Sequence, residues 1–234
     1  MSNFTFLTEE QIFGDNRLDI IKKYGTKCAI TDFSILLGGC LSSNYYTSEG
    51  NTRKDRTGWW WTKSSNGYYD ACIVDTSGNI DCDNVNERYH GARPALLYSS
   101  IQSICSHGVI ASNGIKKIEY GEYPQTIVDE NYSCELERTY NNRSLRTTGK
   151  KYTTDSVGYL YTDTSFRART HTEYEYNGSK YIRFVGDSNC DGEVLSDGRT
   201  IKKGQAYWIR VEPITWLVDE KTNIALSKKI LFSG

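Results

Sequence analysis

Two short stretches of the sequence combine tyrosine, amide and charged side chains, which are residue types that ligand-binding surfaces use. They read SSNGYYDA at residues 64–71 and DNVNERYHG at residues 83–91. Tyrosine gives a large contact area at a low cost in conformational entropy, and asparagine and arginine give adaptable hydrogen bonds. The candidate ligand-binding residues are Asn66, Tyr68, Tyr69, Asn86, Glu87, Arg88 and Tyr89. A solvated loop that binds nothing is the alternative interpretation of the same residues.

Catalytic chemistry has weaker support in the sequence. An enzyme needs a nucleophile, a base or a metal in a recognisable arrangement. The histidines are His90, His107 and His171, and none stands in such a spacing. The 29 acidic residues are scattered and do not single out an acid–base pair. We therefore expect no catalytic residue and a protein that is not an enzyme.

One stretch, DSNCDGEVLSDG, imitates the start of a calcium-binding loop. Asp187, Asn189 and Asp191 supply alternating oxygens, and Gly192 follows them. The twelfth position is Gly198 instead of the bidentate glutamate that such a loop needs. This mismatch favours an ordinary hairpin turn, and we expect neither a metal nor a cofactor.

The cysteines and the first residues indicate a compartment. The chain has seven cysteines and no CxxC pair, which fits neither a zinc site nor a small disulfide framework. The stretch MSNFTFLTEEQIFGDN lacks the features of a secretory signal, and no apolar run approaches the about 18 residues of a membrane span. We expect reduced thiols, a cytoplasmic protein and no membrane partner.

Charge and composition narrow the class further. The 28 Lys and Arg residues nearly balance the 29 Asp and Glu residues, which disfavours a nucleic-acid partner. Eighteen tyrosines and five tryptophans suit β structure. A chain of 234 residues can form one domain or two small ones.

The elements that must position the candidate loops begin with short helices. A capping box at Thr8 and an apolar helical face over residues 16–24 predict a helical start that Gly25 ends. A second short helix is predicted from Thr31, as its N-cap, to Leu37.

From Trp59 the hydrophobic period changes to two, which predicts a hairpin around the turn DTSGN. Gly78 stands where the turn needs a left-handed residue. This register places Val74 opposite Ile80 and Cys72 opposite Cys82, all on one face, which we expect to be the core side. The two cysteines should therefore be close, and we expect their thiols to stay reduced.

The three consecutive tryptophans should alternate in direction along this strand. Trp59 and Trp61 should point one way and Trp60 the other, so at least one ring belongs to the core. Either all three are packing residues, or one ring lies exposed beside Tyr68 and Tyr69.

Further along, residues 101–114 have no sustained period and predict a connector. Strand signals resume in IKKIEYGEYPQ, TEYEY, KYIRFV, AYWIRVEPITWLVDE and NIALSKKIL. Residues 129–156 are polar and predict no element.

The motifs WWWTKS and GARPALLY resemble those of an uncharacterised bacterial domain family, which carries WWLRS and GVRPALW. IEYGEYPQT and AYWIRVEPITWLV are similar to that family's YG-x-YPQ and YWFKVEPIKWRVL motifs. The matching pieces span most of residues 5–98 and 115–232. The family is related to the C-type-lectin-like fold of formylglycine-generating enzymes and of the variable proteins of diversity-generating retroelements. The resemblance implies an α+β fold with twisted antiparallel sheets, long loops and a few short helices.

The halves of the family stand in reversed order in this chain. Residues 1–100 resemble the C-terminal half, residues 101–114 are the connector, and residues 115–234 resemble the N-terminal half. A circular permutation explains this order if both halves share one core, with residues 93–98 beside residues 116–120. Alternatively, two incomplete pieces would need a partner chain, which would make the protein a homo-oligomer or part of an assembly.

The resemblance also implies a function. Arg93 matches the start of a closing strand, which favours a structural role. In the retroelement proteins the equivalent of the loop surface is diversified for ligand capture. We therefore expect a binding module for a protein or glycan, of bacterial or bacteriophage origin and virion-associated if phage-encoded. One alternative is a phage-encoded inhibitor or virion component that acts by occlusion, and another is an oxidase-like enzyme with a copper-binding cysteine pair.

Overall fold

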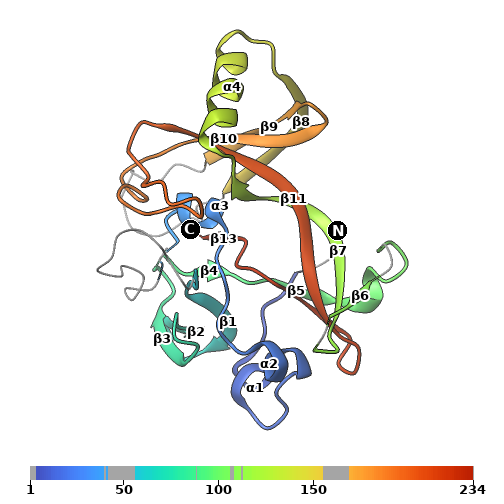
Figure 1. The fold of residues 1–234 in the computed structure, drawn as a ribbon. Coiled ribbons are helices and arrows are strands. Elements are labelled where there is room, and N and C mark those ends of the chain that lie inside the picture. Colours follow the sequence, from blue (N-terminus) through green and yellow to red (C-terminus); the bar gives the residue numbers. More distant parts are fainter. Residues whose placement is uncertain are drawn as a thin grey trace.

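The computed structural model describes residues 4–39, 41, 56–87, 89–105, 108–111, 113–154 and 169–233, and it shows a mixed fold of twisted sheets and short helices (Figure 1). The helices are α1 (Glu9–Phe13), α2 (Asp19–Tyr24), α3 (Asp32–Leu36) and α4 (Glu130–Asn141), with a 3-10 turn η2 (Tyr98–Ser100). The strands are β1 (Trp60–Ser65), β2 (Asp70–Val74), β3 (Ile80–Asn84), β4 (Gly91–Ala92), β5 (Ala95–Leu97), β6 (Val109–Ile110), β7 (Lys116–Ile127), β8 (Arg146–Thr154), β9 (Arg169–Tyr176), β10 (Ser179–Val185), β11 (Ala206–Asp219), β12 (Ile224–Ser227) and β13 (Phe232–Ser233).

The predicted helix starts are confirmed by their caps. The Thr8 side chain accepts a hydrogen bond from the Gln11 amide, and the Gln11 side chain accepts one from the Thr8 amide, which is the reciprocal capping box. Gly25 ends α2 with φ of +79°. The Thr31 hydroxyl accepts a hydrogen bond from the Ser34 amide at 3.1 Å and caps α3. Buried side chains of α1, α2 and α3 belong to the main hydrophobic core.

The smaller sheet has the strand order β13–β4–β1–β2–β3. Its β2–β3 hairpin has the predicted register, because Val74 pairs with Ile80 and Cys72 with Cys82. Gly78 adopts φ of +88° in the turn. The expected core side is only half correct. Val74 and Cys72 are buried, but Ile80 is 37% exposed and Cys82 is half-buried, because β3 is the outermost strand of this sheet.

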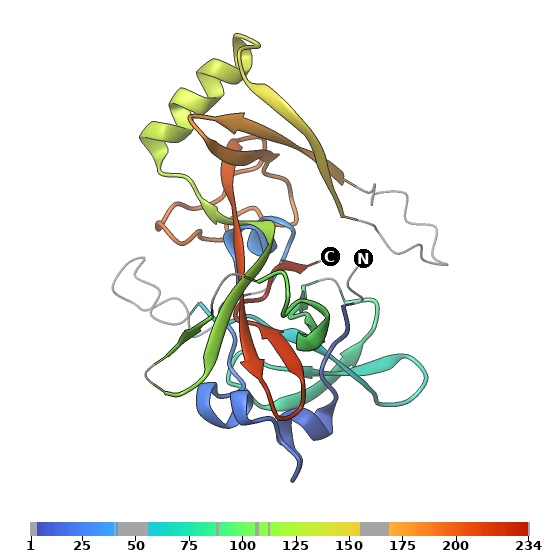
Figure 2. The ribbon, with the colours of Figure 1, turned by 90° about the vertical axis from the view of Figure 1, so that its right-hand side faces the viewer.

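The larger sheet has the order β5–β12–β11–β10–β9–β8. The long strand β11 pairs with β10 and β12 along one edge and with β7 along the other. Strand β6 then pairs with β7. Figure 2 shows β7 and the β11–β12 turn side by side in the lower half of the molecule.

The predicted pairing of residues 93–98 with residues 116–120 is wrong. Leu96 of β5 pairs with Ala225 of β12, and Lys117 of β7 pairs with Leu217 of β11. Strands β12 and β11 therefore separate the two segments, because β11 is long enough to carry both neighbours. The segments nevertheless belong to one sheet.

The polar region for which the sequence predicts no element contains α4 and β8. The Asp129 side chain caps α4 by accepting a hydrogen bond from the Tyr132 amide at 3.0 Å. The helix packs on the upper end of the larger sheet (Figure 1), where Glu137 receives hydrogen bonds from Arg183 and from the Trp208 indole. Its apolar face is short and rich in tyrosine, which hides the helical period in the sequence.

Strand β8 closes the larger sheet, and no described strand lies on its outer side. Its side chains are mostly exposed, and they include Arg146, Lys150 and Lys151. The register with β9 shifts between Thr147 and Lys151, where Gly149 has φ of +85°.

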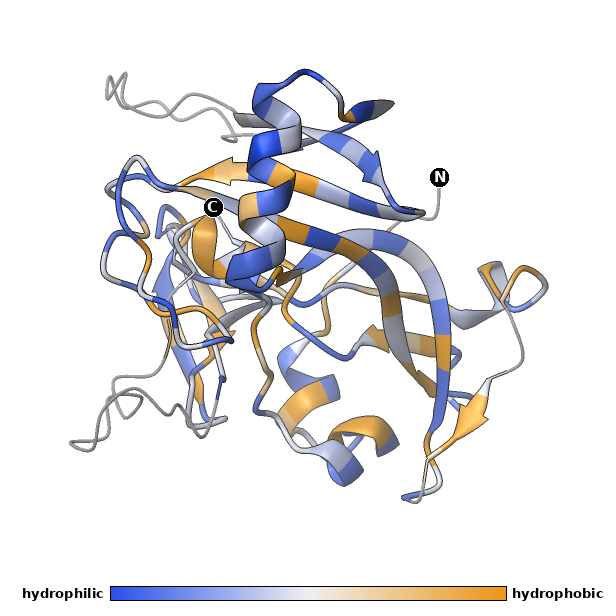
Figure 3. Ribbon diagram, turned by 45° about the horizontal axis from the view of Figure 1, so that its top comes forward, coloured by the Kyte–Doolittle hydropathy of each residue, from blue (hydrophilic) through white to orange (hydrophobic). Residues whose placement is uncertain are grey.

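The main core contains side chains from both parts of the sequence. It joins Phe33 and Trp60 from the first part with Ile182, Leu217 and Leu226 from the second. Figure 3 shows hydrophobic and hydrophilic residues interspersed along the long strand β11, whereas β8 and β9 are mainly hydrophilic along their length. Within the described residues, we find no helix with the length and hydrophobicity needed to cross a membrane.

Candidate functional site

The two candidate loops lie together at one end of the smaller sheet. Asp70 pairs with Asn84 where β2 begins and β3 ends, and beyond this pair the Val85 amide donates a hydrogen bond to the Tyr69 carbonyl at 2.9 Å. The β1–β2 turn and the chain after β3 are therefore adjacent. We call the surface that they form the tyrosine loop surface; its members are Asn66, Tyr68, Tyr69, Val85 and Asn86.

Two tyrosine rings dominate the tyrosine loop surface. Tyr68 is 92% exposed and Tyr69 is 66% exposed. Their rings meet edge to face with centroids 5.1 Å apart. The Asn66 amide donates to the Asp70 carbonyl at 2.9 Å, and Gly67 has φ of +99°, so a tight turn directs the pair away from the core.

Beside the rings, the chain after β3 adds one apolar and one polar side chain to the tyrosine loop surface. Val85 is 43% exposed, and Asn86 is exposed. The Asn86 amide donates to the Asn84 side chain at 2.9 Å, which fixes the backbone and leaves the Asn86 side chain in solvent. Sequence reasoning missed Val85, although the predicted β2–β3 register, continued beyond Asp70 and Asn84, places it opposite Tyr69.

Two other candidate residues, Tyr89 and Glu87, are less exposed than the tyrosine loop surface. Tyr89 is half-buried, and its hydroxyl donates to Asp83 at 3.2 Å. Burial and the neighbouring Asp83 carboxylate raise the pKa of Tyr89 to about 12. Glu87 is half-buried, and its amide closes a turn onto the Asn84 carbonyl at 2.9 Å. Arg88 lies outside the described residues.

The tryptophans explain why Tyr89 is held in place. His90 is buried between two tryptophan rings. The Trp59 ring stacks on the imidazole with ring centroids 5.0 Å apart, and the Trp61 ring meets it edge to face with centroids 4.7 Å apart. The His90 Nε2 atom is 2.9 Å from the Asp83 carboxylate, and Tyr89 packs against the His90 ring at 4.5 Å. These five residues, Trp59, Trp61, Asp83, Tyr89 and His90, form what we call the histidine cluster. It supports the chain that follows β3.

Electrostatics agree with a structural role for the histidine cluster. Burial lowers the pKa of His90 more than its acidic neighbours raise it, so the neutral ring is favoured. Burial opposes ionisation of Asp83, but hydrogen bonds from His90 and from the Asn84 amide outweigh it and lower the pKa of Asp83. The His90 Nδ1 atom is buried and has no hydrogen-bond partner among the described residues.

Trp60 points to the opposite face, so the predicted alternation of the tryptophans is confirmed. Its ring is fully buried, and its indole donates to the Thr26 carbonyl at 3.2 Å. The Arg93 guanidinium lies 5.0 Å from the Trp60 ring centroid and donates to the Ser227 carbonyl at 3.0 Å. Arg93 is itself buried, which places it in the structure of the core and away from any site.

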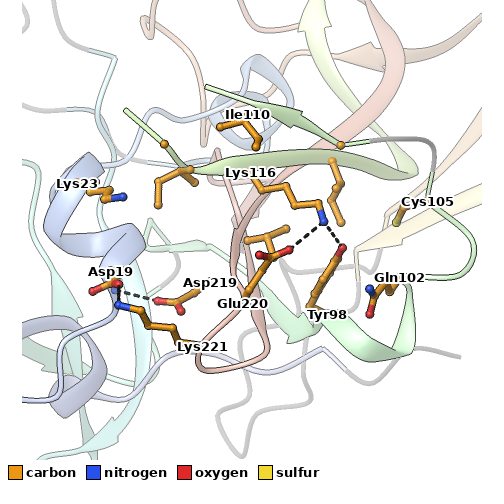
Figure 4. Close-up of a pocket in the computed structure, with 15 residues that line it drawn as sticks. Asp19, Lys23, Tyr98, Gln102, Cys105, Ile110, Lys116, Asp219, Glu220 and Lys221 are labelled. Atoms are coloured by element: carbon orange, nitrogen blue, oxygen red, sulfur yellow. Dashed lines mark hydrogen bonds and ion pairs between the residues drawn. The ribbon is translucent and has the colours of Figure 1, made fainter. Parts of the chain in front are cut away.

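A cavity of about 740 Å³ lies elsewhere, between α2, η2, β6, β7 and the turn after β11 (Figure 4). The charged side chains that line this cavity form hydrogen bonds and ion pairs with other lining residues. Lys116 donates to the Tyr98 hydroxyl at 2.7 Å and to Glu220 at 2.9 Å, and Lys221 donates to Asp19 at 2.6 Å. Ligand pockets usually offer polar groups that converge on an empty space, and here most of those groups already have partners.

The remaining candidates for catalysis stand apart from one another. The sulfur atoms of Cys72 and Cys82 are 3.6 Å apart, and the Glu9 carboxylate is 3.8 Å from the Cys72 sulfur.

The histidines and the calcium-like stretch lie elsewhere. His171 is buried against Phe184 in the other sheet, and His107 lies outside the described residues. The calcium-like stretch forms turns, one of which is closed by Leu195 and Arg199. Across the described part of the chain, no three His, Cys, Asp or Glu side chains gather as a metal site would require.

Comparisons of the chain with protein-family models, with curated proteins and with solved structures found no match. The geometry of the described residues is therefore the basis for a proposal of function.

Proposed function

We propose that this chain is a non-enzymatic binding module that presents the tyrosine loop surface to a protein or glycan ligand. The observation that carries the proposal is the exposure of two adjacent tyrosine rings, at 92% and 66%, on a turn between paired strands. Single exposed apolar residues are ordinary, but contiguous aromatic rings on a rigid support are the usual anchors of interfaces.

The chemistry of the surface fits such a ligand. A tyrosine ring can stack on the apolar face of a sugar or accept a cationic side chain on its own face. Asn66 and Asn86 offer amide donors and acceptors beside the rings. Asp70 is exposed next to Tyr69, and it favours a ligand that carries hydroxyl or cationic groups.

A matched pair of variants tests this proposal. The double variant Tyr68→Ala/Tyr69→Ala removes the two rings, and Ile110→Ala removes an apolar side chain of comparable exposure, 72%, from β6 in the other sheet. Both variants and the parent protein would be measured against a glycan array and against partners isolated with the parent protein. We expect the double variant to weaken binding by roughly 30-fold or more, as loss of interface anchors does, and Ile110→Ala to leave it unchanged. Equal binding by all three proteins would refute the proposal.

We also propose that the architecture is lectin-like and circularly permuted. Both described ends of the chain support this, because Thr5 bridges to Ala95 and Phe232 pairs with Ala92. The ends therefore lie near each other, as permutation requires. A chain that runs from residue 108 to the C-terminus and continues through a short glycine linker into residues 4–105 should fold to the same far-UV and near-UV spectra. An unfolded product would count against the permutation.

A second function is favoured by one specific observation, the close sulfur atoms of Cys72 and Cys82. An oxidase-like enzyme would bind copper(I) through such a pair. Burial, together with the hydrogen bond to Cys82, raises the pKa of Cys72 to about 11, which disfavours the thiolate that a metal needs. Stoichiometric copper(I) binding that Cys72→Ser and Cys82→Ser both abolish would support the enzyme over the binding module.

A further inference from the structure

The two cysteines of the β2–β3 hairpin are placed for a covalent bond. Cys72 and Cys82 are directly opposite in the antiparallel register, with their side chains on the same face. Residues opposite one another in such a ladder have Cα atoms about 4.5–5.5 Å apart, which lies within the range that a disulfide spans. The two sulfur atoms are 3.6 Å apart, so bond formation needs only a small side-chain movement.

Solvent reaches the cysteine pair from the Cys82 side. Cys82 is half-buried on the outermost strand, and Cys72 is buried behind it. A reagent from solvent therefore meets Cys82 first. None of the described cysteines is in a disulfide, and Cys134, whose thiol is the most exposed of them, lies on α4.

The sequence led us to expect thiols that stay reduced; from the 3.6 Å separation of the sulfur atoms we propose instead that Cys72 and Cys82 form a reversible cross-strand disulfide that stiffens the support of the tyrosine loop surface. The second part of this proposal rests on the proposed binding function. The pair is two residue pairs from the end of the ladder, since Ala71–Asp83 and Asp70–Asn84 follow it. Beyond them comes the hydrogen bond between Tyr69 and Val85. A covalent bond at the cysteines would hold both strands that lead to the surface.

The reaction is a thiol–disulfide exchange with a low-molecular-weight disulfide as the oxidant. The Cys82 thiolate attacks one sulfur of that disulfide, whose S–S bond breaks and releases one thiolate. Cys72 then loses its proton to solvent and attacks the Cys82 sulfur of this mixed disulfide, which releases the second thiolate. Two cysteine thiols are thus oxidised, and one small disulfide is reduced to two thiols.

The test uses the full chain in buffers with increasing ratios of glutathione disulfide to glutathione, with a metal chelator present. Free thiols are then alkylated and the peptides are mapped by mass spectrometry. We expect one linked peptide pair, Cys72 with Cys82, which dithiothreitol reverses and which Cys134→Ser leaves intact. Cys72→Ser should instead hold glutathione on Cys82. Linkage absent under conditions that modify Cys134 would overturn the proposed bond.

The effect on the loop is measured without a ligand, so its outcome is independent of the binding proposal. Hydrogen exchange would be followed at the Val85 amide in the reduced and oxidised protein. We expect about tenfold slower exchange after oxidation, because the bond restrains local opening of the hairpin. The Cys72→Ser protein in the same oxidising buffer should show no change. Unchanged Val85 exchange in a fully linked protein would overturn the stiffening, and it would leave the tyrosine variants as a separate test of binding.

Discussion

Aromatic residues have different roles in this protein, and the solvent exposure of each side chain decides which role it has. Trp60 is fully buried, whereas Tyr68 and Tyr69 lie in solvent a few residues further along the chain. Trp60→Ala should lower the free energy of unfolding by ~3–5 kcal/mol, because it leaves a large cavity and frees the Thr26 carbonyl. Urea denaturation followed by far-UV circular dichroism measures this loss.

The matched controls for that variant are Tyr68→Ala and Tyr69→Ala. Each should change the free energy of unfolding by less than about 1 kcal/mol, since neither ring is covered. Tyr89→Ala should fall between the two cases, because its ring and hydroxyl contact the histidine cluster. If the exposed tyrosine variants unfolded as readily as the Trp60 variant, the rings would be packing residues and the binding proposal would lose its basis.

The histidine cluster predicts a specific response to acid. Burial lowers the pKa of His90 in the folded protein, so the unfolded chain binds a proton more readily. Stability should therefore be complete above the unfolded histidine pKa of about 6.5 and should fall as the pH decreases through it. Asp83 also has a lowered pKa, but its contribution is lost only near or below about pH 4.

Unfolding free energies measured in urea between pH 7.5 and 5 would isolate the histidine. The unfolding free energy of the parent protein should decrease over this range, because the unfolded chain takes up a proton at His90 before the folded chain does. His90→Gln should show a flatter profile, even if its absolute stability is lower. A profile as steep as that of the parent would show that another group causes the acid sensitivity.

At the scale of elements, the β2–β3 hairpin depends on Gly78 for two reasons. Its φ of +88° disfavours other residues, and an added Cβ would lie 2.5 Å from the Thr26 hydroxyl oxygen. Gly67 shares the first property with φ of +99° but has open space around it. Gly78→Ala should thus lower the unfolding free energy by about 2–4 kcal/mol, and Gly67→Ala by about 1–2 kcal/mol. Equal losses in thermal or urea denaturation would show that the contact with Thr26 is unimportant.

The elements also show which parts of the fold can be predicted from sequence. Strict alternation and a turn glycine define the β2–β3 hairpin locally, so its register is predictable. The α4 helix is not, because Leu136 is the main aliphatic residue on its buried face and tyrosines supply the rest. Tyrosine is compatible with a strand, a helix or a loop, and tertiary packing decides between them.

Within the candidate site, too, the surroundings of some residues can be predicted from the sequence and those of others cannot. The exposure of Tyr68 and Tyr69 follows from a short turn between two predictable strands. The burial of Tyr89 depends on Trp59, Asp83 and His90, which meet only when the chain after β3 folds back against β1. Contacts of that kind have no local pattern in the sequence. The sequence predicts strands β11 and β12 themselves, but for the same reason it does not predict their position between β5 and β7.

At the scale of the whole molecule, Asp32 connects segments that are far apart in the chain. Its carboxylate accepts hydrogen bonds from Arg56, from the Ile127 amide and from both the amide and the hydroxyl of Ser196. Asp32 is only 2% exposed, so loss of its carboxylate would leave several buried donors without partners. This single side chain links α3 to the end of β7 and to the loop before β11.

Asp32→Ala should lower the unfolding free energy by about 3–5 kcal/mol, as removal of one partner from a buried ion pair does. The matched control is Asp197→Ala, because Asp197 pairs with Arg199 at 2.6 Å on the surface. That variant should cost about 0–1 kcal/mol. Urea denaturation measures both losses. If Asp32→Ala produced two separate transitions with one unaffected, the two parts of the chain would be independent units.

The outer strand of the larger sheet has a consequence for the behaviour of the protein in concentrated solution. Strand β8 ends that sheet with exposed Arg146, Lys150 and Lys151, and its ladder is interrupted at Gly149. A second chain that tried to extend the sheet would bring like charges together and would meet a bent, irregular backbone. Stacking of molecules into fibrils through this edge is thereby opposed, even though the sheet itself is long and rich in β-branched and aromatic residues.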